Sequence, residues 1–260
     1  MTLTVTVLGC GSSGGSPIPG VGWGKCDADE PRNRRLRPSL LVEQNGGARV
    51  LFDTSPDLRQ QLLTADITAL DGVVFSHAHA DHLHGIDDLR GLNRAMDSAI
   101  KGYADKTTLD HIAHRFEYVL SPLPEGATRY FKPTLEMQEI RVGEPFSVGG
   151  LDILPLDQDH GYSRTLGFRI GGFAYSTDLK DMPPDSFDAL KGIDTWVLGV
   201  FTDYPHPTHL HLEKALDWIN VIKPRRTLLT HLGPDLDYRT VSDGLPVGVE
   251  LAYDGRVITL

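Results

Sequence analysis

The feature that most constrains this chain is a run of histidines and an aspartate directly after a short apolar segment. Residues 72–76, Gly-Val-Val-Phe-Ser, read as a strand, and residues 77–82 are His-Ala-His-Ala-Asp-His. Residues two apart in a strand point the same way, so the first two histidines can face one point. The aspartate and the last histidine follow as the chain turns into a helix and can face a second point. Imidazole and carboxylate suit Zn²⁺, Mn²⁺ and iron. The predicted metal ligands of this cluster are His77, His79, Asp81 and His82.

Two metal ions side by side need more ligands than these four, including one that bridges them. Three further candidates stand at the ends of predicted strands: His160, Asp178 and His231. Asp178 has two carboxylate oxygens and is therefore the group best suited to bridge two ions. These three residues support a common site because each stands at the end of a predicted strand, as the first cluster does.

The His-x-His-x-Asp-His motif at positions 77 to 82 resembles that of the metallo-β-lactamase fold, and His160, Asp178 and His231 come in the order of that superfamily. The resemblance spans nearly the whole chain. It implies an α/β protein, a four-layer αβ/βα sandwich with a dinuclear metal centre at one edge. It also implies two divalent ions, Mn²⁺ or Zn²⁺. The implied ligands are His77, His79 and His160 for one ion and Asp81, His82 and His231 for the other, with Asp178 as the bridge.

Finer features resemble the phosphodiesterase branch of this superfamily, which includes the phosphoribosyl cyclic phosphodiesterase of phosphonate breakdown and the tRNA 3′-processing nucleases. The Gly-rich segment 9–17 looks like the turn of that branch, and residues 33–39 are similar to the segment that follows it. That branch places an extra, non-ligand histidine at the start of a later helix. His209 matches it, and His211 is the rival two residues further on.

The resemblance implies phosphodiester chemistry in which Asp81 and His209 are the catalytic residues. A water bound to the metal loses its proton near neutral pH and attacks phosphorus, while the two cations stabilise charge on the phosphoryl oxygens. A protonated His209 could neutralise the departing alkoxide or bind a phosphoryl oxygen. The expected function is hydrolysis of a small cyclic phosphate diester, of the phosphoribosyl 1,2-cyclic phosphate or 2′,3′-cyclic nucleotide type.

Two other functions of the same fold remain as alternatives. One is tRNA 3′ processing, which ranks lower because the chain has 25 basic against 35 acidic residues and a net charge of −10. No stable nucleic acid partner is therefore expected, and the partner is a small-molecule phosphodiester. The other is hydrolysis of thioesters, lactones or β-lactams, for which His209 would be dispensable. Redox chemistry is disfavoured, because diiron relatives usually carry a glutamate where His79 stands. The sequence leaves open whether the protein forms a homodimer.

Other sequence features bound the context of this site. No apolar run approaches 18 residues and no signal peptide is recognisable, so no membrane association and a cytoplasmic location are expected. In the early loop, residues 9–38, Cys26 is the one cysteine beyond the Gly-rich segment, and Pro234 stands near the place of a late histidine. The separate structural zinc site of the phosphonate enzyme is therefore predicted to be absent. Asp53, at the end of a predicted strand, could support a ligand histidine. The arginines at 32, 34, 35 and 37 are interpreted as a solvated loop.

The chain is interpreted as one domain over 1–260, with an inserted lid or arm at 95–133, where strand signals are few. A helix is predicted from His82 to about Asn93 and another at 209–223. The pair Gly171-Gly172 predicts a two-residue hairpin. Strands followed by helices in both halves indicate two sheets packed between helical layers. The remaining predicted strands are 4–8, 39–43, 49–54, 139–142, 151–156, 166–170, 173–176, 195–200, 226–230 and two short ones near 251 and 257–260, and the remaining helices are 57–64 and 185–191.

Overall fold

The computed structural model describes residues 2–260, and these residues form two seven-stranded sheets that face each other. The first sheet has the order β14 (Arg256–Thr259), β1 (Leu3–Gly9), β2 (Ser39–Gln44), β3 (Arg49–Phe52), β4 (Gly72–Val74), β5 (Ile100–Ala104) and β6 (Leu135–Glu139). The second has the order β13 (Val249–Leu251), β12 (Arg226–Thr230), β11 (Thr195–Gly199), β10 (Phe173–Ser176), β9 (Arg164–Ile170), β8 (Leu151–Asp159) and β7 (Phe146–Val148).

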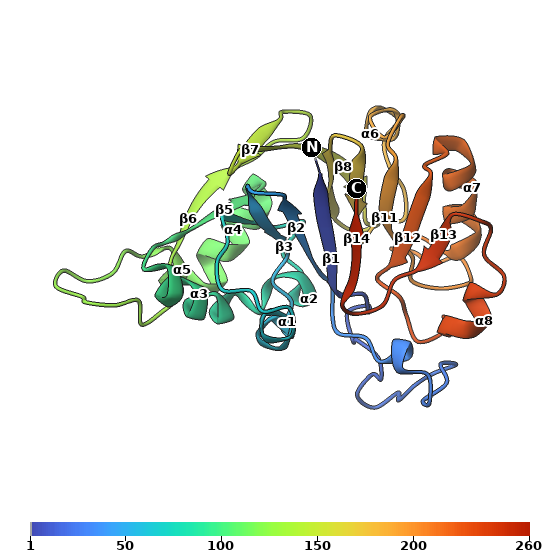
Figure 1. Cartoon of the computed structure of the whole chain (residues 1–260), viewed down its shortest axis with the longest axis horizontal. Coiled ribbons are helices and arrows are strands. Elements are labelled where there is room, and N and C mark those ends of the chain that lie inside the picture. Colours follow the sequence, from blue (N-terminus) through green and yellow to red (C-terminus); the bar gives the residue numbers. More distant parts are fainter. Residues whose placement is uncertain (1) are drawn as a thin grey trace.

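Helices cover the outer face of each sheet (Figure 1). In chain order they are α1 (Leu58–Thr64), α2 (Ala80–Leu83), α3 (Leu89–Met96), α4 (Lys106–Arg115), α5 (Glu117–Leu120), α6 (Pro184–Asp188), α7 (Leu212–Ile222) and α8 (Tyr238–Ser242), with short 3₁₀ turns at Pro31–Asn33 and Ile86–Asp88. Helices α1 to α5 lie beside the first sheet and α7 lies beside the second. The four-layer sandwich expected from the sequence is therefore confirmed. None of the helices among residues 2–260 is long and apolar enough to cross a membrane.

Each sheet combines four parallel strands with three antiparallel ones, and the carboxyl ends of its parallel strands lie at one edge. Strands β3 to β6 run parallel to one another, and so do β10 to β13, while the remaining pairs are antiparallel. The carboxyl ends of parallel strands meet at one edge, where loops collect functional side chains. Six of the seven candidate ligands follow the parallel strands β4, β10 and β12, and His160 follows the antiparallel strand β8.

Both faces of the first sheet are buried, and the alternation of its strands explains how. In β3, Val50 and Phe52 pack into the core between the sheets, whereas Leu51 packs into the core under the helices. The same alternation holds in β2. Successive strand residues point to opposite faces, so an unbroken apolar strand fits only a sheet that is covered on both sides.

The segment 95–133 differs from the expected insert, because its first part belongs to the sheet. Residues 100–104 form β5, which pairs with β4 on one side and β6 on the other. This strand has a weak sequence pattern because it contains Lys101 and Gly102. A glycine is needed at position 102, because a Cβ there would lie 2.2 Å from the sulfur of Met137. Within this segment, it is the loop from Ser121 to Thr134, between α5 and β6, that projects from the body (Figure 1). Strand β6 also begins four residues earlier than the predicted strand at 139–142.

Two predicted helices have different bounds in the structure. The helix expected from His82 to Asn93 is divided into α2, a 3₁₀ turn and α3, and the division falls at Gly85, where a Cβ would lie 1.9 Å from the carbonyl oxygen of Ser55. The helix expected at 209–223 begins only at Leu212. The hairpin at Gly171-Gly172 is confirmed, since β9 ends at Ile170 and pairs antiparallel with β10.

The early loop is fixed by one of the arginines that the sequence analysis placed in solvent. Arg35 is 2% exposed, and its guanidinium donates to the carbonyl oxygens of Gly233 and Leu236 at 3.2 and 2.6 Å and to Asn33 Oδ1 at 3.0 Å. The solvated-loop interpretation is wrong for this residue, because the carbonyls that bind it come from a segment 200 positions away. Arg35 thus ties the early loop to the chain that follows His231.

Replacing Arg35 with alanine is expected to lower the free energy of unfolding by about 3 kcal/mol, because buried hydrogen bonds to a charged donor are lost and their acceptors stay buried. Urea denaturation measures the change. The matched control is Arg34→Ala, the exposed neighbour, which should change stability by no more than about 0.5 kcal/mol. Equal losses in the two variants would contradict the role given to Arg35.

Candidate metal centre

The first four candidate ligands lie where β4 runs into α2. The backbone of Ser76 still accepts a hydrogen bond from Leu166 N of the second sheet, at 2.9 Å. His79 is extended, with φ −67° and ψ 155°, and caps α2, so Asp81 and His82 lie within the first turns of that helix. The change from extended chain to helix separates the four side chains into two pairs that face neighbouring points.

The other three candidates come from the second sheet. His160 follows β8, Asp178 follows β10 and His231 follows β12. Asp178 and His231 have positive φ angles of 47° and 57°. Side chains other than glycine adopt this left-handed conformation rarely, and it is concentrated at functional sites. In both residues it turns the side chain at the strand end toward the first sheet's cluster.

The structure brings all seven predicted ligands together in two groups that share one member. Each residue offers one ligand atom, and within each group these atoms lie within 4.8 Å of one another. The first group is His77, His79, His160 and Asp178, and the second is Asp81, His82, Asp178 and His231.

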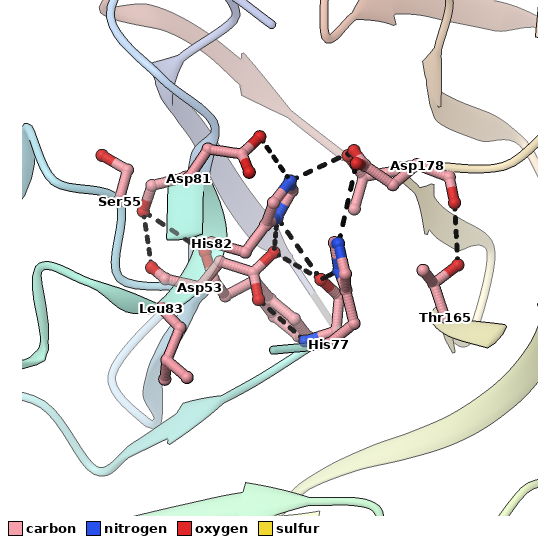
Figure 2. A network of polar contacts seen from close by, with 12 residues as sticks. Asp53, Ser55, His77, Asp81, His82, Leu83, Thr165 and Asp178 are labelled. Carbon is pink, nitrogen blue, oxygen red and sulfur yellow. Dashed lines mark hydrogen bonds and ion pairs between the residues drawn. The ribbon is translucent and has the colours of Figure 1, made fainter. Parts of the chain in front are cut away.

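The carboxylate of Asp178 faces both groups, with one oxygen toward each (Figure 2). Its Oδ1 lies 3.1 Å from His82 Nε2 and 2.8 Å from His231 Nε2. Its Oδ2 lies 3.6 Å from both His77 Nε2 and His160 Nε2. This is the arrangement that a carboxylate bridging two cations would need.

Several buried polar atoms at this point have no hydrogen-bond partner within the described chain. They include His77 Nε2, His82 Nε2, His231 Nε2 and Asp81 Oδ2. The three Nε2 atoms lie 3.6, 3.1 and 2.8 Å from an Asp178 oxygen, without hydrogen-bond geometry. Buried polar groups are almost always satisfied, so a cluster of orphaned atoms aimed at one place indicates a missing partner. Imidazole nitrogens and carboxylate oxygens together suit a divalent metal ion.

The charges of the centre support the same partner. Burial lowers the pKa of His77 well below its ordinary value and that of His160 to about 4, so both rings are neutral near pH 7. Burial alone would raise the pKa of Asp178, but the facing His231 and His82 hold it well below its usual range. Burial alone would lower the pKa of His231, but the nearby carboxylates of Asp178 and Asp81 raise it to about 9. The two carboxylates therefore attract positive charge to this point.

Side chains behind the ligands hold two of the rings in place. Asp53, which is fully buried, lies with Oδ2 2.6 Å from His82 Nδ1 and accepts hydrogen bonds from Ser76 Oγ and N at 2.7 Å (Figure 2). The carbonyl oxygen of Thr208 lies 2.8 Å from His160 Nδ1. Asp53 was expected in this role; Ser76 and Thr208 were not, and the Thr208 contact is a backbone one that side-chain identity cannot reveal.

Replacing Asp53 with asparagine is expected to weaken metal binding about 10- to 100-fold, because such partners orient the ligand ring and raise its basicity. Competition with a chromogenic chelator measures the affinity. Asp66→Asn is the matched control, since Asp66 is exposed and shares a left-handed backbone, with φ 51° against 63° for Asp53. Unchanged affinity in the Asp53 variant would show that His82 needs no such support.

His209 lies at the centre and His211 does not. His209 Nε2 is 3.6 Å from Asp178 Oδ2, and its ring stacks on that of His231 at 5.2 Å. It belongs to no ligand group, and its side chain is 18% exposed. His211 is the N-cap residue of α7. Contrary to the sequence expectation, His209 is outside the helix, in a loop whose neighbouring Leu210 pairs with Leu179 O at 2.6 Å.

The early loop borders the same edge. Its Gly-rich turn joins the chain after His231, because Ser12 N donates to Leu232 O and Leu232 N donates to Cys10 O. Cys26 is buried, with its sulfur 3.4 Å from the carbonyl oxygen of Pro234. Cys26 is in neither ligand group, and the absence of a structural zinc site at this loop stays a prediction.

The β-lactamase superfamily domain matches residues 48–232 of the chain. A solved structure described as a new diphosphatase from the PhnP family is similar over 100% of this chain and 98% of its own, with 33% identity and a TM-score of 0.89.

Two curated proteins match over less of their own length. The octanoyltransferase of Porphyromonas gingivalis (strain ATCC BAA-308 / W83) is 35% identical over 251 residues, which are 96% of this chain but 50% of that protein. A ribonuclease Z of Bradyrhizobium sp. (strain ORS 278) is 39% identical over 74 residues, 28% of this chain and 24% of the ribonuclease. The chain thus spans half the length or less of these two relatives.

Proposed function

The chain belongs to the family of the β-lactamase superfamily domain. On that premise, we propose that it is a phosphodiesterase that hydrolyses small cyclic phosphate diesters and uses two divalent metal ions, Mn²⁺ or Zn²⁺. The substrate is of the phosphoribosyl 1,2-cyclic phosphate or 2′,3′-cyclic nucleotide type. The observation that carries the proposal is His209, a histidine outside both ligand groups whose Nε2 lies 3.6 Å from the bridging Asp178. The similarity to the diphosphatase supports it.

In this proposal the seven ligands hold the ions, which supply an activated water and stabilise charge on the phosphoryl oxygens. His77, His79 and His160 would hold the first ion and Asp81, His82 and His231 the second, with Asp178 available to both. Asp81 is the second proposed catalytic residue, and its Oδ2 lies 3.3 Å from His82 Nε2 and 3.5 Å from His231 Nε2 within the second group. Asp53 and the carbonyl of Thr208 keep the ligand rings oriented.

His209 supplies the proton that the reaction needs. Its Nδ1 lies 2.8 Å from Thr208 Oγ1, which leaves Nε2 directed at the space beside Asp178. From there Nε2–H can donate its proton to the departing alkoxide oxygen, as the oxygen of water forms a new bond to phosphorus and the ring P–O bond breaks. Ring opening of the cyclic diester then leaves a phosphomonoester and a free hydroxyl.

The test is hydrolysis by chelator-treated protein before and after Mn²⁺ or Zn²⁺ is returned. Bis(p-nitrophenyl) phosphate reports diester cleavage, and ribose 1,2-cyclic phosphate and adenosine 2′,3′-cyclic phosphate report the proposed class. Turnover of a cyclic diester that depends on added metal is expected. Metal binding without cleavage of any of the three would reject the proposal and favour thioester or lactone hydrolysis.

Ribonuclease activity is the second candidate, because of the match to ribonuclease Z. The net charge of −10 argues against it, since tRNA binding draws most of its affinity from basic residues. Cleavage of precursor tRNA faster than of the cyclic diesters, by the same metal-loaded protein, would reverse the order of the two.

A further inference from the structure

The loop that carries His209 contains a second histidine, which the reaction outlined above does not use. His206 stands between Pro205 and Pro207, three positions before His209. The rings of the two histidines lie 5.1 Å apart, and both pack against Phe201, at 5.0 and 4.9 Å between ring centres. A proline fixes its own φ and restricts the residue before it, so this loop has few conformations of its own. His206 is therefore held beside His209.

Thr208 lies between the two rings and links them. Its Oγ1 is 2.8 Å from His209 Nδ1 and 3.3 Å from His206 Nδ1. Its methyl group has a close neighbour, since a Cβ at Gly161 would lie 2.9 Å from Thr208 Cγ2. Its carbonyl oxygen is held as well, by His160 Nδ1 at 2.8 Å. Thr208 thus contacts a ligand ring through its backbone and His209 through its side chain.

One contact sets the direction of the hydrogen bonds in this chain of side chains. The backbone N–H of Thr208 donates to His206 Nδ1 at 3.4 Å. A backbone N–H cannot accept, so His206 Nδ1 carries no hydrogen and is an acceptor. Burial and the neighbouring His209 lower the pKa of His206 below its ordinary value, which agrees with a neutral ring at this position.

The remaining hydrogens follow from that acceptor. The hydroxyl of Thr208 donates toward His206 Nδ1, and a hydroxyl has a single hydrogen to give. Thr208 Oγ1 therefore accepts from His209 Nδ1–H. The 3.3 Å between the two Nδ1 atoms requires the same assignment, because without a hydrogen on either atom two lone pairs would face each other. His209 thus carries a hydrogen on Nδ1, and Nε2 is the acceptor of its neutral ring.

We propose that Thr208 and His206 are positioning residues for His209: they keep a hydrogen on Nδ1 and so leave Nε2 as the nitrogen that gains and gives the reacting proton. The inference rests on the proposed function, in which that proton goes from Nε2 to the departing alkoxide oxygen. The proton that the attacking water releases restores Nε2–H, and Nδ1–H stays on the ring throughout. A catalytic ring whose far nitrogen is bonded in this way needs no reorientation before it reacts.

The kinetic test removes the hydroxyl of Thr208 and keeps its shape and its backbone carbonyl. In metal-loaded Thr208→Val, kcat for ribose 1,2-cyclic phosphate is expected to fall by about 10- to 30-fold, with KM within about 2-fold. Hydrolysis of bis(p-nitrophenyl) phosphate should fall by about 3-fold at most, because p-nitrophenolate leaves without a proton. Thr208→Ser, which keeps the hydroxyl, should restore the cyclic diester rate to within about 3-fold. Equal losses for both substrates in Thr208→Val would overturn the proposal and leave Thr208 as a support for the loop.

Two variants of His206 test the far end of the chain. His206→Leu removes the acceptor and should lower kcat for the cyclic diester by about 5-fold or more, whereas His206→Asn offers an amide oxygen near the place of Nδ1 and should lose less. Thr202→Val is the matched control, because the hydroxyl that it removes belongs to the same loop but donates to the carbonyl oxygen of Tyr204. It should change the ratio of the two substrate rates by about 2-fold at most. Full activity of His206→Leu on the cyclic diester would overturn the proposal.

A measurement without turnover separates this inference from the proposed function. The ring nitrogens of His209 are observed by ¹⁵N NMR in Zn²⁺-loaded protein, in alkaline buffer where histidine rings are neutral, and are identified by their absence from His209→Ala. We expect the hydrogen on Nδ1 in the wild type and a change of tautomer in the double variant Thr208→Val/His206→Leu. If no ester is cleaved but this pattern is present, the proposed function fails and the positioning of His209 stands. If esters are cleaved while the wild type carries the hydrogen on Nε2, or the double variant changes nothing, only this inference fails.

Discussion

Replacement of Asp178 by alanine is expected to remove metal from the protein and to lower kcat for diester hydrolysis by about 1000-fold or more. The carboxylate is the one side chain common to both ligand groups, so its loss takes a ligand from each. Metal ions supply several kcal/mol of stabilisation to the transition state of such a reaction, and about 4 kcal/mol corresponds to that factor. Metal content by atomic emission and hydrolysis of bis(p-nitrophenyl) phosphate give the two readouts.

Asp181→Asn is the control for this variant, because Asp181 lies three residues further on, is exposed and pairs with Lys214 at 2.9 Å. Asp178→Asn tests the effect of charge alone, because asparagine keeps the side-chain volume but removes the negative charge that His231 and His82 face. It should also fail to retain two ions. An alanine variant that holds two metals and turns over normally would rule out Asp178 as the bridge.

The second large effect is expected for His209→Ala, with kcat lower by about 100- to 10 000-fold for a cyclic ribose diester and metal content unchanged. The ring belongs to no ligand group, so the ions should remain while the proton donor is lost. A poor alkoxide leaving group needs that proton, whereas p-nitrophenolate departs without one. Bis(p-nitrophenyl) phosphate hydrolysis should therefore fall by about 10-fold at most.

His211→Ala is the matched control, with the same substitution two residues away at the N-cap of α7, where the side chain makes no capping hydrogen bond. It should change neither kcat nor metal content by more than about 2-fold. Equal losses for both leaving groups in His209→Ala would favour a binding role for His209 over a proton donor. No loss at all would favour thioester or lactone hydrolysis.

Much of the candidate centre could be predicted from sequence because its chemistry is local. Four ligand-type residues lie in one run at the end of a strand, and strand periodicity alone directs His77 and His79 to one side. The family resemblance then supplied the order of His160, Asp178 and His231. The covered sheets were also predictable, since continuous apolar strands such as β3 fit only a sheet buried on both faces.

What the sequence could not settle depends on segments that meet only in the folded chain. Arg35 looks like a loop residue until the carbonyls of Gly233 and Leu236 surround it. Strand β5 is weak by composition and exists because β4 and β6 pair with it on both sides.

The sequence by itself determined the candidate ligands, through strand ends and residue chemistry, and its resemblance to a known family supplied the four-layer fold and the grouping of those ligands. Only the tertiary structure placed His209 beside Asp178 and His211 at the N-cap of α7, since a hydrogen bond from Leu210 to Leu179 keeps His209 off the helix. Only it brought Arg115 beside the first ligand cluster, where its Nη1 donates to the carbonyl oxygen of Ala78, 37 positions away. Contacts between distant backbone groups carry no signature in side-chain order, and they decide which polar residues reach the site.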